Sequence, residues 1–143
     1  MFIGEYKYLI DSKKRLAIPA KFRAELGSKA IVTRGLDRSL FLYTKKTWQA
    51  VADKLSTLPF SQSDVRGFSR IMLAGAMEVD VDKAGRILLP DYLKEYASLD
   101  KEVAVIGISN RIEIWDMKSW SEYKKNTEKE IGNMSERLKE LGI

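Results

Sequence analysis

The chain contains no cysteine and no histidine among its 143 residues. A disulfide framework is therefore excluded, and a conventional zinc site lacks its usual ligands. Without histidine there is also no Ser-His-Asp triad and no histidine general base. No apolar run approaches the ~20 residues of a membrane helix, and no long apolar stretch follows Met1 as in a signal peptide. No phosphate-cradling Gly-rich loop is present either. We therefore expect a cytoplasmic protein that needs no cofactor, metal or membrane.

Positive charge is concentrated in the first half of the chain. The 25 Lys and Arg residues outnumber the 20 Asp and Glu residues, for a net charge of +5. Residues 1–75 carry 14 basic and 6 acidic side chains, whereas residues 76–143 carry 11 basic and 14 acidic ones. The total excess is moderate, but its uneven distribution favours a basic surface on the N-terminal part that meets a polyanion.

The chain contains an internal repeat. Residues 11–23 match residues 82–94 at an offset of 71, and residues 35–48 match residues 107–120 at an offset of 72. The matched positions of the first pair combine charged, proline and apolar residues: Asp11/Asp82, Arg15/Arg86, Pro19/Pro90, Leu16/Ile87, Ile18/Leu89 and Phe22/Leu93. An ordered series of this kind favours two copies of one unit. It predicts two domains, residues 1–75 and 76–143.

Each copy is predicted to form four strands and one short helix. Pro19 and Pro90 stand where the helices begin, because the first helical N–H needs no partner. Alternating apolar residues and turn residues give the boundaries. The predicted strands are 6–10, 16–18, 30–34 and 39–43 in the first copy and 77–81, 87–89, 102–108 and 111–115 in the second, and the helices are 20–26 and 91–97.

Longer helices are predicted after each copy. In the insert between the copies, Thr44 is an N-cap, Pro59 ends the first helix, and a second helix spans residues 63–73. A C-terminal helix begins near Lys118, and we expect residues 132–133 to interrupt it. Its apolar stripe alternates by three and four residues, as in a heptad pattern: Trp120, Tyr123, Thr127, Ile131, Met134, Leu138 and Leu141. This stripe packs on its own domain or on a neighbouring subunit.

Two turns of the pattern D-x-x-x-R contain the candidate functional residues. The first turn spans residues 11–15 and the second spans residues 82–86. Asp11 and Asp82 are predicted to hold the turns by accepting backbone N–H bonds. Arginine binds phosphates and guanine edges in two places at once, lysine binds phosphates, and a two-stranded ribbon fits the major groove. The predicted DNA contacts are therefore Lys13, Lys14, Arg15, Lys83 and Arg86.

The motifs resemble those of the MraZ family over about residues 1–125. Two D-x-x-x-R turns in tandem at this spacing are specific, whereas either turn alone is a weak signal. The other matching stretches are Met1-Phe2-x-Gly4-Glu5-Tyr6, Pro19-Ala20-Lys21-Phe22-Arg23, Arg34-Gly35-Leu36-Asp37 and Gly107-x-Ser109-Asn110-Arg111-Ile112-Glu113-x-Trp115.

The resemblance implies an α+β fold of the AbrB-like swapped-hairpin superfamily. Both halves of the barrel would lie in one chain as a pseudo-dimer, with short helices, a central helical insert and a C-terminal helix. It further implies a nucleoid-associated transcriptional regulator, usually a repressor, that assembles into octameric or dodecameric rings. Such rings bind short direct-repeat boxes in double-stranded DNA upstream of their own division and cell-wall gene cluster. The family's DNA-contacting arginine maps to Arg15 and Arg86.

One departure from the family pattern concerns the first turn. The family usually has glycine before the arginine, as Gly85 in the second turn, but Lys14 stands there in the first. A positive φ at this place would strain lysine but not glycine. Either the first turn has another geometry, or Lys14 tolerates the strain for a phosphate contact. The greater charge of the first turn favours it as the main source of affinity.

The sequence leaves three other functions open. An antitoxin-like or scaffold protein would bind a protein partner through the C-terminal helix. A carboxylate-dependent enzyme would hold magnesium on Glu78, Asp80 and Asp82, which alternate along one strand face, although a solvated face explains them as well. RNA binding is the third, but no aromatic stacking platform stands out.

Overall fold

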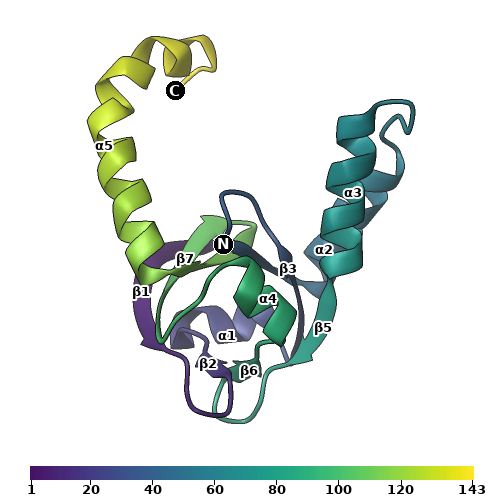
Figure 1. The fold of residues 1–143 in the computed structure, drawn as a ribbon, viewed down its shortest axis with the longest axis vertical. Helices are drawn as coiled ribbons and strands as arrows, with labels where there is room; N and C mark the ends of the chain where they lie inside the picture. The colour runs from purple at the N-terminus through teal and green to yellow at the C-terminus, as the bar shows by residue number, and fades with distance from the viewer.

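The computed structural model describes residues 1–143 as a small β-barrel that carries two helical arms (Figure 1). The strands are β1 (Phe2–Leu9), β2 (Arg15–Ala17), β3 (Lys29–Arg34), β4 (Leu40–Thr44), β5 (Met77–Asp80), β6 (Arg86–Leu88), β7 (Glu102–Ser109) and β8 (Arg111–Asp116). The helices are α1 (Ala20–Leu26), α2 (Lys45–Ser56), α3 (Ser63–Gly75), α4 (Asp91–Tyr96) and α5 (Met117–Glu140).

The two repeats exchange strands. Six strands form an antiparallel sheet in the order β1-β7-β8-β4-β3-β5, and β2 and β6 form a separate two-stranded ribbon. Strand β1 of the first repeat pairs with β7 of the second, and β5 of the second pairs with β3 of the first. This interleaving confirms the predicted α+β pseudo-dimer, because each repeat completes the sheet of the other.

The register shows a pseudo-two-fold axis through the barrel. In the ribbon, Leu16 lies opposite Ile87, its own equivalent at the offset of 71. In the large sheet, Phe41 lies opposite Glu113, its equivalent at the offset of 72. Equivalent residues can face each other only on a symmetry axis. The sequence repeat therefore corresponds to the two halves that this axis relates.

The main core lies between the large sheet and the ribbon. Eighteen buried residues form it, drawn from both repeats, and Leu16 and Ile87 at the ribbon's centre are fully buried. The rings of Phe2 and Phe22 meet edge to face at 5.3 Å, which ties β1 to α1. Burial of this shared core holds the ribbon on the barrel.

The helical arms pack on the outer face of the large sheet. Helices α2 and α3 cover Phe41 and Tyr43, and α5 begins against Trp115. Thr44 caps α2 as predicted, since its hydroxyl accepts a bond from the Thr47 N–H at 3.0 Å. Both arms project from the end of the barrel opposite the ribbon (Figure 1). None of the helices combines the length and the apolar character that crossing a membrane requires.

Most elements begin or end within one or two residues of the predicted positions, and two differences are larger. Strand β1 begins at Phe2 rather than at residue 6, because β7 offers pairing partners along its whole length, from Ser109 to Glu102. The predicted interruption at residues 132–133 is wrong, and α5 continues to Glu140. One glycine costs a helix only about 1 kcal/mol, which the surrounding helix-forming residues offset.

Candidate nucleic-acid interface

The ribbon and its two turns form one end of the barrel (Figure 1). Since side chains alternate along a strand, Leu16 and Ile87 face the core and their neighbours face outward. Arg15 lies opposite Leu88, and Arg86 lies opposite Ala17. The two arginines are therefore diagonal neighbours on the outer face, a relationship that places Cα atoms typically about 7–8 Å apart.

Asp11 holds the first turn through both carboxylate oxygens. Its Oδ1 accepts the backbone N–H groups of Lys13 and Arg15, each at 2.9 Å. Its Oδ2 accepts the Nε–H of Arg15 at 2.9 Å. The backbone bond from Arg15 is the largest influence on the Asp11 carboxyl and lowers its pKa, so this carboxyl is ionised at neutral pH.

Asp82 holds the second turn in the same way. Its Oδ1 accepts the N–H groups of Ala84 and Arg86 at 2.9 Å, and its Oδ2 accepts the Arg86 Nε–H at 3.0 Å. The backbone bond from Arg86 lowers the pKa of Asp82 most. Two turns that are 71 residues apart thus share one arrangement, in which an aspartate fixes the arginine four residues later.

The arrangement leaves the ends of both guanidinium groups free. Each aspartate accepts the Nε–H of its arginine. The Nη amines of Arg15 and of Arg86 form no hydrogen bond to the protein. The two side chains are about a third exposed, at 31% and 34%. Exposed ion pairs of this kind contribute little to the stability of a fold. Their effect is orientation: each pair presents a planar, two-pronged donor outward.

The first turn adopts the left-handed geometry of the second. Lys14 has φ of 64° and Gly85 has φ of 77°. The question that the sequence leaves open is thus answered, since Lys14 accepts the strained conformation rather than changing the turn. Its ammonium, however, lies on Asp91 at the start of α4, with Nζ 2.8 Å from Oδ1. Lys13 and Lys83 are exposed and form no ion pair.

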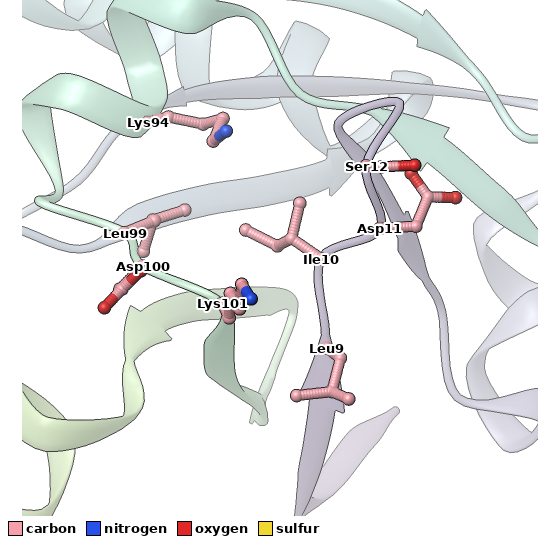
Figure 2. A pocket seen from close by; sticks show the side chains of 8 residues that line it. All are labelled: Leu9, Ile10, Asp11, Ser12, Lys94, Leu99, Asp100 and Lys101. Atoms are coloured by element: carbon pink, nitrogen blue, oxygen red, sulfur yellow. The ribbon is translucent and has the colours of Figure 1, made fainter.

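Two further basic residues lie beside the turns, and neither is among the contacts that the sequence predicts. Arg23 on α1 lies against Gly85, since a Cβ built on that glycine would stand 2.1 Å from Arg23 Nε. Lys94 on α4 lines an open groove of about 390 Å³ beside the first turn, together with Asp11. Figure 2 shows Lys94 and Asp11 on opposite sides of Ile10. Arg23 and Lys94 are equivalent at the offset of 71, and this shared basic character was the available signal.

The acidic residues along β5 are paired with basic side chains. Glu78 lies 2.9 Å from Lys45 Nζ, and its bond to Lys45 lowers its pKa. Asp80 lies 3.5 Å from Lys29, and Asp82 holds the second turn. No three metal-ligating side chains gather anywhere in the chain. The three carboxylates of the magnesium hypothesis thus bond to Lys45, to Lys29 and to the residues of the second turn.

Comparison with known proteins places the chain in a family. The family model described as "MraZ protein, putative antitoxin-like" matches twice in tandem, over residues 1–71 and 72–141. The chain belongs to the MraZ family. Relatives along the full length of both chains include the transcriptional regulator MraZ of Caldanaerobacter subterraneus, which is 48% identical, and that of Syntrophomonas wolfei, which is 46% identical. The MraZ of Moorella thermoacetica, also named a transcriptional regulator, is 48% identical over the same extent.

Proposed function

We propose that this MraZ-family protein is a sequence-specific, DNA-binding transcriptional regulator and not an enzyme. The observation that carries the proposal is the ribbon's outer face, where Arg15 and Arg86 are each fixed by an aspartate and present free Nη amines. The relatives' names as transcriptional regulators support the same function.

The geometry suits double-stranded DNA. A two-stranded ribbon fits the major groove, which is ~12 Å wide, and an arginine fork bonds the O6 and N7 atoms of guanine. Lys13 and Lys83, at the tips of the turns, would contact phosphates on either side. The arginines would thus read bases and the lysines would add salt-dependent affinity.

The finer part of the proposal rests on the family resemblance. The protein would repress its own division and cell-wall gene cluster from the nucleoid, bound to short direct-repeat boxes as an octameric or dodecameric ring. One ribbon offers a small contact surface, so linking several ribbons would turn weak contacts with successive boxes into strong binding. Affinity would then depend on the spacing of the boxes as well as on their sequence.

The arms support assembly into a homo-oligomer. They expose apolar side chains that the chain itself does not cover, among them Phe60 and Ile71 on the α2–α3 arm and Tyr123 and Ile131 on α5. Exposed apolar groups that gather on one part of a molecule mark interaction sites. Because the arms lie at the end opposite the ribbon, copies could join through them without covering the turns.

The test is fluorescence anisotropy with a labelled duplex from the gene's own upstream region, a scrambled duplex and a salt series. We expect preference for the native duplex, and loss of that preference in Arg15→Ala and Arg86→Ala. Lys54→Ala removes one exposed charge from α2, far from the ribbon, and serves as the matched control. Equal, steeply salt-dependent binding to both duplexes would contradict the proposal.

A second candidate is binding of a protein partner through α5. The observation in its favour is Ile131, which is 58% exposed on a helix with no buried residue. Sedimentation of the purified protein separates the two cases. A discrete homo-oligomer that Ile131→Asp dissociates would assign α5 to contacts between copies, whereas a monomer indifferent to this substitution would favour a different partner.

A further inference from the structure

The two ends of the ribbon are chemically different although the backbone is nearly symmetric. A pseudo-two-fold axis passes between Leu16 and Ile87 and relates the first turn to the second. A true dimer would present identical turns and would bind a box equally well in either direction. In this chain the residues packed against the two turns are not the same. The two possible orientations of the ribbon on a box are therefore not equivalent.

A guanidinium group supports the second turn. The Nε–H of Arg23 donates to the Ile18 carbonyl at 2.8 Å, which fixes the side chain against Gly85. Gly85 has no Cβ, and this absence provides the space that Arg23 occupies. Arg23 forms no ion pair, and its Nη amines have no protein acceptor. The Cζ atom of the guanidinium group lies beside Gly85, the residue that precedes Arg86, so the unpaired Nη amines are available to a phosphate at this turn.

A neutralised lysine supports the first turn. Lys14 replaces the glycine, and its ammonium is bound to Asp91, with 2.8 Å and 2.9 Å to the two carboxylate oxygens. The second repeat has no such pair, because the equivalents of Lys14 and Asp91 are Gly85 and Ala20. Lys94, the equivalent of Arg23, offers a single ammonium in place of a planar fork.

We infer that Arg23 is an additional phosphate-binding residue at the second turn, and that the unequal turns make the protein bind each box in one fixed direction. The inference rests on the proposed DNA-binding function. The second turn would grip the backbone with Lys83 and Arg23 beside the base-reading Arg86. The first turn would grip it with Lys13, while Asp91 holds Lys14 and repels the phosphates. A box that is not a palindrome then fits the ribbon one way round.

The absence of native cysteine makes the direction measurable. Ser12→Cys and Ala84→Cys each place one thiol on an exposed residue of one turn. Each variant would carry a tethered iron–EDTA group that cuts nearby DNA, and the probe would be an end-labelled duplex from the gene's own upstream region. We expect the Ser12 variant to cut one flank of each box and the Ala84 variant to cut the opposite flank.

The outcomes separate this inference from the proposed function. Cutting of both flanks by both variants would overturn the fixed direction while DNA binding itself stands. Failure of the unlabelled wild-type protein to prefer the native duplex would overturn the proposed function, and this inference with it. Cutting at one flank only, opposite for the two variants, would establish the direction.

The role of Arg23 is tested by salt dependence. Arg23→Gln keeps a side-chain N–H donor and removes the charge, so we expect affinity to fall about tenfold and the slope of log affinity against log salt to decrease by about one. Arg23→Lys should retain the slope, and Lys54→Ala should leave it unchanged. A slope that Arg23→Gln does not alter, in a variant that melts at the wild-type temperature, would show that Arg23 only supports the turn.

Discussion

Lys14 Nζ lies 2.8 Å from Asp91 Oδ1, so the first turn of one repeat is tied to helix α4 of the other. The bond from Lys14 lowers the pKa of the Asp91 carboxyl, which is therefore ionised at neutral pH. A phosphate that approaches Lys14 must compete with this carboxylate and is also repelled by it. Asp91 thus offsets the extra positive charge that Lys14 gives the first turn.

Asp91→Ala is expected to strengthen DNA binding. The substitution frees Lys14 and removes a negative charge beside the first turn, so affinity for the native duplex should rise several-fold. The salt slope should steepen by about one, because one more lysine becomes available to phosphate. Anisotropy titrations at four or more salt concentrations measure both effects. Glu128→Ala, the same charge change on an exposed residue of α5, is the control. An equal gain in both variants would mean that only net charge matters.

Asp11→Asn is expected to weaken specific binding although it makes the protein more positive. Asparagine can no longer accept two backbone bonds and the Arg15 Nε–H as an anion, so Arg15 loses its fixed orientation. Preference for the native over a scrambled duplex should fall at least tenfold, whereas non-specific binding should hold or rise. Competition between the two duplexes measures the ratio. A preserved preference would show that the arginine is oriented by other contacts.

Acid is expected to destabilise the fold through the same carboxylates. The pKa values of Asp11, Asp82 and Asp91 are all lowered in the folded state. A lowered pKa gives stability that is present above the unfolded value, about 3.9 for aspartate, and is lost as pH falls through the folded value. Midpoints of urea denaturation should therefore be constant at neutral pH and fall below about pH 4.

The double variant Asp11→Asn, Asp82→Asn isolates the contribution of the turns to this acid dependence. It should be less stable than the wild type at pH 7, and its denaturation midpoint should fall less between pH 5 and pH 3. Parallel curves for the two proteins would assign the acid dependence to other groups.

The sequence predicts local structure well here because each element occurs in both repeats, so its pattern can be compared between two copies. A turn such as residues 11–15 can be read from its own spacing, since Asp11 and Arg15 are neighbours along the chain. The contacts between Arg23 and Gly85 and between Lys14 and Asp91 are different, because they join residues of opposite repeats. They exist only because the strands interleave, and no pattern within one segment of the sequence predicts them. The sequence also predicts a break at Gly132 that α5 does not have. The free-energy cost of one glycine is small compared with the summed helix propensity of the other residues.

Gly107→Ala tests the exchange of strands that builds the barrel. A Cβ at this position would stand 2.4 Å from the Ile3 nitrogen and 2.5 Å from the Phe2 carbonyl carbon, both backbone atoms of β1. Since β1 cannot move away without losing its pairing with β7, we expect a loss of about 2–3 kcal/mol in the free energy of unfolding. Gly67→Ala, in the open on α3, should instead stabilise by up to about 1 kcal/mol. Similar effects of both substitutions in urea denaturation would contradict the close approach of β1 and β7.

The isolated first repeat, residues 1–75, is expected to dimerise rather than to fold alone. In the full chain β1 takes its partner from the second repeat, and β3 gains β5 from it as well. A lone repeat lacks both partners, but a second copy supplies equivalent strands along the same axis. Its folding should therefore depend on concentration, as in an obligate dimer. Sedimentation and circular dichroism over a hundredfold dilution measure this, and residues 11–75, which lack β1, should fail to dimerise. A folded monomer at the lowest concentration would mean that the first repeat is a self-sufficient domain and that the exchange of strands is not needed for its stability.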